Sequence, residues 1–104
     1  MTRTFKHLDC GNIRYVFRKG FAVEIVWRDV EQKWFVYPLD DHLPEQPGLG
    51  DTIREALSDY AELFDLLYLE CVSGRHDGTT AGKRLVKHVK HLVSRTEKIL
   101  PRLC

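Results

Sequence analysis

Apolar and polar residues alternate in the first part of the chain with the period of two that is typical of β-strands. Residues 13–18 show this alternation, and in residues 21–28 the apolar side chains share one face: Phe21, Val23, Ile25 and Trp27. Only Lys19 and Gly20 separate the two runs. Because glycine tolerates the backbone angles of tight turns, we predict an antiparallel hairpin that turns at these two residues.

A third run, residues 33–37, is rich in aromatic and β-branched residues and predicts another strand. Pro38 has no backbone N–H to donate to a sheet, so this strand should end there. Further prolines and glycines follow in residues 38–50, which we predict to be a loop. Residues 1–38 are accordingly the strand-rich part of the chain.

In the second half of the chain the apolar residues recur in alternating steps of four and three, which predicts two amphipathic helices. The first helix should cover residues 51–72, because Thr52 and Glu55 match a capping box and an apolar stripe follows: Ile53, Leu57, Tyr60, Phe64, Leu67 and Cys71. The second should cover residues 80–101 and end at Pro101. Its stripe consists of Leu85, Val89, Leu92, Thr96 and Ile99.

These elements predict an α+β fold, in which an antiparallel sheet of three or more strands, a β-meander, is followed by two amphipathic helices packed on it. A length of 104 residues, 43% of them hydrophobic, fits one domain over residues 1–104. Residues 40–70 hold nine acidic residues and one basic residue, whereas residues 83–102 hold seven lysines and arginines and one glutamate. This contrast predicts antiparallel pairing of the two helices.

The bulk properties exclude several classes of protein. A formal net charge of +1 argues against a general polyanion-binding protein, which usually carries a basic excess. The sequence has no run of about 18 apolar residues for a membrane span, and its first residues lack the apolar core of a signal peptide. We therefore expect no membrane association and a cytoplasmic location. Three cysteines without a repeated spacing indicate neither a disulfide framework nor a four-cysteine zinc site: Cys10, Cys71 and Cys104.

The segment that leads into the first helix resembles a known family. Its residues are similar to the pattern DLPG…GDT..EAL of HicB-like antitoxins at Leu43-Pro44, Gly50-Asp51-Thr52 and Glu55-Ala56-Leu57. The resemblance covers residues 21–70 and implies a hairpin followed by an amphipathic helix, in a small fold related to a truncated ribonuclease-H core. It also implies a role, which is to bind and mask a small basic ribonuclease toxin without any chemistry by this chain.

Aromatic residues around the third strand are too numerous for one face of a small sheet to bury: Trp27, Trp34, Phe35 and Tyr37. We therefore predict a homodimer in which a second subunit covers them, the alternative being an N-terminal strand pair that wraps over them. The acidic helix offers a further surface for a basic partner, although a solvated helix face also accounts for its charges. The candidate partner-binding residues are Trp34, Tyr37, Glu55, Asp59 and Glu62.

One flank of the second predicted helix is basic, and such a surface can meet phosphate groups. The candidate nucleic-acid-binding residues on this flank are Arg84, His88, His91, Arg95 and Lys98. The acidic helix and the near-neutral total charge favour a charge match within the chain or between subunits instead. A small nucleic-acid-associated regulator is therefore the second hypothesis, and a small-molecule-binding domain is the third.

No residue pattern predicts a catalytic, cofactor-binding or metal site. His88 and His91 lie one helical turn apart and can share a zinc ion, but the sequence offers no obvious further ligands. His7 and Cys10 form another such pair, where neighbouring lysines and arginines oppose a dication. Cys71 lies on the apolar stripe, which favours burial over nucleophilic chemistry. The leading hypothesis is a non-enzymatic protein-binding module without a cofactor.

Overall fold

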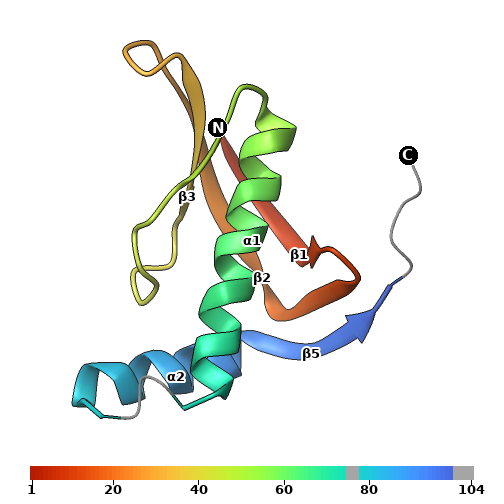
Figure 1. Ribbon diagram of the computed structural model, residues 1–104, viewed down its shortest axis with the longest axis vertical. Helices are drawn as coiled ribbons and strands as arrows, with labels where there is room; N and C mark the ends of the chain where they lie inside the picture. Colours follow the sequence, from red (N-terminus) through yellow and green to blue (C-terminus); the bar gives the residue numbers. More distant parts are fainter. Residues whose placement is uncertain (75–77, 100–104) are drawn as a thin grey trace.

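The computed structural model describes residues 1–74 and 78–99. This part of the chain contains five strands and two helices (Figure 1). In chain order they are β1 (Thr2–Cys10), β2 (Ile13–Arg28), β3 (Lys33–Pro38), β4 (Gly48–Gly50), α1 (Ile53–Val72), α2 (Thr80–Leu92) and β5 (Val93–Lys98). The strands form one antiparallel sheet on which both helices pack, so the predicted α+β fold is confirmed. Neither helix is long and apolar enough to cross a membrane.

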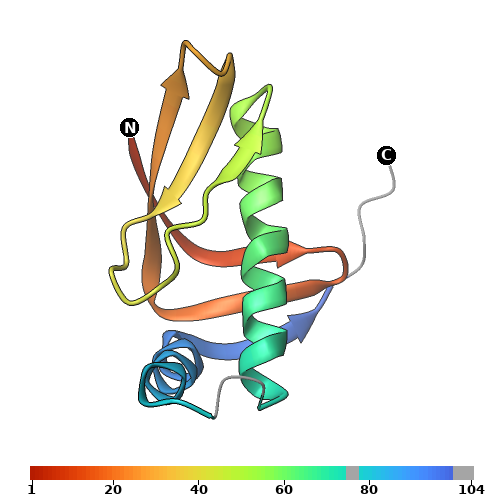
Figure 2. The same cartoon turned by 60° about the vertical axis from the view of Figure 1, so that its left-hand side comes forward.

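The long strand β2 runs through the middle of the sheet. β1 pairs with both halves of β2, whereas β5 pairs with the first half, from Ile13 to Phe17, and β3 pairs with the second half, from Val23 to Arg28. β4 extends the sheet beyond β3. The two halves of β2 therefore share β1 on one side and have different neighbours on the other, β5 beside the first half and β3 beside the second (Figures 1 and 2).

The prediction of a hairpin that turns at Lys19 and Gly20 is wrong, because β2 continues through both residues. Gly20 has a φ of 90° and bends the strand, and opposite this bend the register of β1 shifts between Phe5 and His7. The tight turn lies earlier, at Gly11 and Asn12, which connect β1 to β2. β1 thus supplies the pairing partner for both runs that the sequence predicted to pair with each other.

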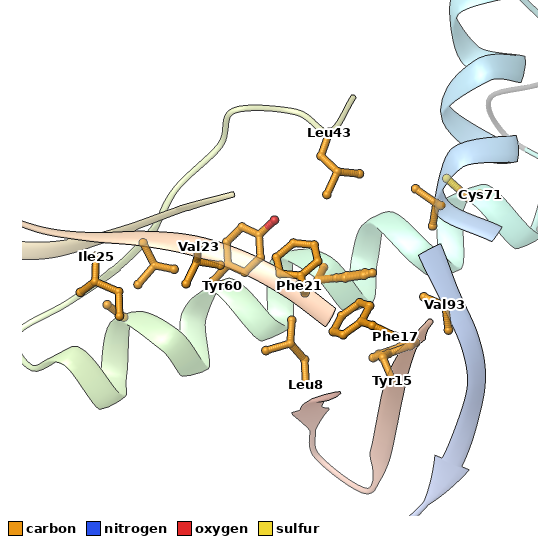
Figure 3. Close-up of a cluster of buried hydrophobic side chains, with 14 of the residues drawn as sticks. Leu8, Tyr15, Phe17, Phe21, Val23, Ile25, Leu43, Tyr60, Cys71 and Val93 are labelled. Atoms are coloured by element: carbon orange, nitrogen blue, oxygen red, sulfur yellow. The ribbon is translucent and has the colours of Figure 1, made fainter. Parts of the chain in front are cut away.

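Helix α1 lies on one face of the sheet and closes the hydrophobic core. Phe64 of α1 stacks on the rings of Tyr15, Phe17 and Phe21, with centroids 5.4, 5.4 and 5.6 Å away. Figure 3 shows these three β2 rings gathered in the core. Such aromatic pairs contribute about 0.5–1.5 kcal/mol each beyond the burial of their surface. Because the rings come from both sides of the bend, α1 holds the two halves of β2 in one core.

Helix α1 begins where the capping pattern predicted. Thr52 Oγ1 accepts a hydrogen bond from the backbone N–H of Glu55 at 3.1 Å, and the Glu55 carboxylate accepts one from the backbone N–H of Asp51, also at 3.1 Å. The second bond lies one residue further toward the N-terminus than in the standard capping box. Just before this cap, β4 passes so close to α1 that a Cβ on Gly48 or Gly50 would lie 2.4 Å from the helix backbone.

The second helix is shorter than predicted. It ends at Leu92, where the chain enters β5; Pro101, the residue expected to end it, lies outside the described residues. Val93 is buried and pairs with Phe17, which satisfies an edge of β2 that would otherwise lie unpaired. Figure 1 shows α2 lying across the C-terminal end of α1, and Figure 2 shows α2 nearly end-on beside that end. The predicted antiparallel pairing of the two helices is therefore wrong.

Candidate protein-binding face

The sheet has one face covered by both helices and an opposite face that neither helix covers, which we call the open face (Figures 1 and 2). Successive side chains of β2 alternate between these faces. On the core side they are buried: Tyr15, Phe17, Phe21, Val23 and Ile25. On the open face they are Arg14, Val16, Ala22, Glu24, Val26 and Arg28, which are partly or largely exposed.

Apolar and aromatic side chains gather where β2, β3 and β4 lie side by side. Val26 pairs with Phe35, and Phe35 pairs with Leu49, which is 42% exposed. Phe35 stacks on Tyr37 at a centroid distance of 5.9 Å. The guanidinium of Arg28 lies 4.9 Å from the centre of the Phe35 ring and donates a hydrogen bond to the Tyr37 hydroxyl at 2.9 Å. We call this region, Val26, Phe35, Tyr37 and Leu49, the aromatic half.

The other end of the open face carries paired charges. Arg14 Nε donates to Asp9 at 2.8 Å, and Arg95 Nε donates to Glu97 at 2.7 Å. The hydrogen-bonded Arg14 guanidinium holds the pKa of Asp9 below its ordinary value, although partial burial opposes this effect. Val16 lies next to Arg14 on the same face of β2, opposite Arg95 on β5. We call this region, Asp9, Arg14, Val16, Arg95 and Glu97, the charged half.

The candidate partner-binding residues from the sequence do not form one surface. Tyr37 lies on the open face, but Trp34 points to the core side, where its ring meets Trp27 at a centroid distance of 5.4 Å. The carboxylate of Glu55 belongs to the helix cap, and that of Asp59 accepts a hydrogen bond from the Leu49 backbone N–H at 2.8 Å. Glu62 is exposed on α1. The residues that sequence reasoning missed, Val26 and Leu49, belong to neighbouring strands.

The candidate nucleic-acid-binding residues are also dispersed. Arg84 and His91 are exposed on α2, whereas His88 contacts a carboxylate of the loop before β4. Arg95 and Lys98 lie on β5 rather than on a helix, and the alternation of a strand puts them on opposite faces. The continuous basic stripe predicted from helical spacing is therefore wrong.

Asp40 lies between two histidines. Its Oδ2 is 2.6 Å from Nε2 of His88 on α2, and its Oδ1 is 3.4 Å from Nδ1 of His42. Oδ1 also accepts the backbone N–H of His42 at 2.9 Å, and the two imidazole rings lie 4.7 Å apart. Burial raises the pKa of Asp40, but the hydrogen bonds with His88 and His42 outweigh it and hold this pKa below its ordinary value. The cluster joins segments 48 residues apart.

Two other features bear on ligand binding and chemistry. A groove of about 270 Å³ between the loop before β4 and the helices is lined mainly by apolar residues, among them Pro44, Tyr60, Leu66 and Leu85. Pockets for drug-sized ligands usually measure about 300–1,000 Å³, so this groove is small for such a ligand. At Cys10, burial and nearby carboxylates raise the pKa of the thiol, which keeps it protonated and weakly nucleophilic.

Comparison with known proteins adds no functional assignment. No family model matches the chain, and no curated protein or solved structure matches it either. The resemblance to HicB-like antitoxins stays a prediction from the sequence. The geometry of the open face is therefore the main guide to function.

Proposed function

We propose that this chain is a non-enzymatic protein-binding module whose contact surface is the aromatic half of the open face. The observation that carries the proposal is a contrast within that face. The charged half pairs its charges within the chain, whereas the aromatic half presents Phe35, Tyr37 and Leu49 with neither helix over them. An exposed apolar patch with a polar rim is typical of protein contacts, and aromatic residues and arginine are enriched in them.

A second copy of the chain is the partner that we expect first. Glu24 and Arg28 stand on the open face on either side of Val26 along β2. A two-fold axis near Val26 and perpendicular to β2 would place the arginine of each subunit close to the glutamate of the other, while the aromatic side chains meet at the centre. Two-fold contacts of this kind are the commonest closed arrangement of identical subunits.

A small basic toxin is the finer proposal, and it rests on the resemblance to HicB-like antitoxins. Glu55 and Asp59 bind backbone N–H groups within the chain, so the acidic flank of α1 offers less free charge than its composition suggests. We therefore expect a toxin to contact the aromatic half as well. This role places the chain in the cytoplasm and predicts that co-expression relieves the toxicity of a protein encoded by a neighbouring reading frame.

A matched pair of substitutions tests the contact surface. Val26 and Val16 are both partly buried valines on the open face of β2, one in each half. We expect light scattering at micromolar concentration to give a dimer mass for the wild-type protein and for Val16→Glu. Val26→Glu should give a monomer mass, because it buries a carboxylate at the centre of the contact.

Circular dichroism should show that both variants remain folded. A wild-type monomer excludes the homodimer and leaves another protein as the partner, to be tested by co-expression with the neighbouring frame. If both co-expression and light scattering give no complex, the aromatic half is not a protein-binding surface. If Val16→Glu disrupts the dimer and Val26→Glu does not, the contact lies in the charged half and the proposal is wrong.

A further inference from the structure

We propose that Asp40, His42 and His88 bind a divalent transition-metal ion, with zinc as the expected ion, and that this ion fastens α2 to the loop before β4. Each residue offers one ligand atom, and these atoms lie within 4.8 Å of one another. Two of the residues come from the loop and the third from the middle of α2, so the site exists only in the folded chain. The proposal is independent of the protein-binding surface, which lies on the opposite face of the sheet.

The donor set fits zinc better than magnesium, calcium, manganese or ferrous iron. Zinc is bound by imidazole nitrogens and carboxylate oxygens, and three protein ligands leave a fourth position for water. Magnesium and calcium prefer oxygen ligands and usually keep several of them. Zinc also binds nitrogen-containing sites more tightly than manganese or ferrous iron. Two histidines and one aspartate are therefore a zinc-binding set that magnesium should not occupy.

The distances are close to those of a metal site. With zinc–ligand bonds of about 2.0–2.1 Å, the ligand atoms of a tetrahedral site lie about 3.3 Å apart. Oδ2 of Asp40 lies 2.6 Å from His88 and Oδ1 lies 3.4 Å from His42, and the ligand atoms of the three residues all lie within 4.8 Å of one another. Movements on the order of 1–2 Å would bring the three ligand atoms to these separations and admit the ion. The hydrogen bond from the His42 backbone N–H already orients the Asp40 carboxylate, in the way that outer-shell partners orient metal ligands.

His42 is the residue that distinguishes a metal site from an ordinary ion pair. The contact between Asp40 and His88 already pairs those two side chains, and His42 brings a second imidazole nitrogen to the same carboxylate. The His42 side chain is 74% exposed and is free to extend into solvent, yet its ring lies 4.7 Å from that of His88 and its Nδ1 faces Asp40. An ion shared by all three groups explains why both rings converge on one carboxylate.

The position of the site indicates what the ion would do. α2 contributes only two buried side chains to the core, Val86 and Val89. The loop before β4 is held from the inside by Leu43, which is 4% exposed and lies over the core in Figure 3. A metal ion between the loop and α2 would add a link outside the core. Since the ligands meet only in the native state, binding should raise the thermal stability of the chain.

Zinc titration of the tag-free protein, after removal of metals by a chelator, tests this proposal. We expect one zinc ion per chain by calorimetry, a rise in melting temperature, and no effect of magnesium. Cobalt should give the visible absorption of a tetrahedral site, which zinc then removes. His42→Asn should weaken zinc binding by more than about 100-fold, because losing even an outer-shell partner weakens it about 10–100-fold.

The variants also separate metal binding from folding. His42→Asn removes a ligand but leaves the contact between Asp40 and His88 intact, so it should fold as the wild type does without metal. His91→Gln is the matched control, because His91 is exposed on the same helix and outside the cluster. Absence of stoichiometric zinc in the wild type would overturn the proposal. Equal zinc affinity of His42→Asn and wild type would do the same.

Discussion

The two halves of β2 agree on their core face and differ on their open face. Toward α1 both halves present buried aromatic or aliphatic side chains, including Tyr15 before the bend and Val23 after it. On the open face the first half lies among ion pairs, whereas the second lies beside Phe35 and Tyr37. The shared core face therefore explains how the chain folds. The difference between the two halves on the open face indicates where another molecule can bind.

The neighbours of β2 explain this difference. Beside the first half, Asp9 of β1 pairs with Arg14 across the sheet face, and Arg95 pairs with Glu97 along β5. Beside the second half, β3 is rich in aromatic residues. β4, at the outer side of β3, has only 3 residues. The exposed edge of β4 is blocked instead, because Asp59 accepts the Leu49 backbone N–H. This protects against uncontrolled strand pairing and leaves the aromatic side chains available for a contact.

The largest loss of stability should come from Gly50→Ala, which disturbs the packing of β4 at the edge of the aromatic half. A Cβ at this position would lie 2.4 Å from the backbone nitrogen of Ala56 and 2.6 Å from Cβ of Glu55. Helix backbone cannot yield as a flexible side chain can, so we expect the free energy of unfolding to fall by about 3 kcal/mol or more. Urea denaturation measures this loss, and hydrogen exchange should show it first in β3 and β4.

Gly78→Ala is the control for this change, because a Cβ there would meet no atom of residues 1–74 and 78–99 within 4 Å. It should leave the urea midpoint nearly unchanged. A Gly50→Ala variant as stable as Gly78→Ala would show that β4 does not pack tightly on α1. The aromatic half would then lack a fixed edge, and Leu49 could not be counted as part of its surface.

A smaller loss should follow from Gly20→Ala, which acts at the bend between the two halves. Gly20 has a φ of 90°, and its new Cβ would lie 2.9 Å from Cγ2 of Thr4. Left-handed backbone costs other residues about 1–2 kcal/mol, and we expect a loss of stability of this size plus the contact with Thr4. Urea denaturation of Gly20→Ala and of the double variant Gly20→Ala, Thr4→Ser separates the backbone strain from the contact with Thr4.

Thr4→Ser removes Cγ2, so the double variant should regain the part due to contact and keep the part due to backbone strain. Thr4→Ser alone supplies the reference for this comparison. Full recovery of stability in the double variant would mean that the backbone at Gly20 is not strained. No loss in Gly20→Ala would mean that the bend does not need glycine.

Local signals in the sequence predicted what depends on neighbours along the chain. Thr52 and Glu55 fixed the start of α1 because the capping bonds join residues three or four positions apart. The alternation in β2 likewise identified the core residues on its buried face. On β3 the same alternation puts Phe35 and Tyr37 together, so this part of the aromatic half was within reach of sequence reasoning.

Long-range pairing decided the elements that were predicted wrongly. Val93 to Lys98 continue a helical spacing, but the unpaired edge of β2 draws them into a strand. The run Thr2–Cys10 has no clean alternation because its register shifts midway, so it gave no strand signal of its own. The contact between Asp40 and His88 joins residues 48 positions apart, and no spacing rule could have found it.

The smallest loss of stability should come from Asp9→Asn, which removes one ion pair from the charged half and leaves the aromatic half unchanged. The pKa of Asp9 is lowered from 3.8 by its hydrogen bond with Arg14, against partial burial. A lowered pKa stabilises the fold above the unfolded-state pKa, and this contribution is lost as the pH falls through the folded-state pKa. The variant should therefore be slightly less stable than wild type at neutral pH, by less than either glycine variant.

Below about pH 4 this difference should shrink and then disappear, because the wild-type carboxyl also becomes protonated. Urea denaturation at a series of pH values measures the trend, with Asp41→Asn, in the exposed part of the loop, as the control. A difference that persists at low pH would mean that Asp9 acts through packing rather than charge. Light scattering of Asp9→Asn should give the wild-type mass, since the proposed contact lies in the other half; a changed mass would extend the binding surface across the bend at Gly20.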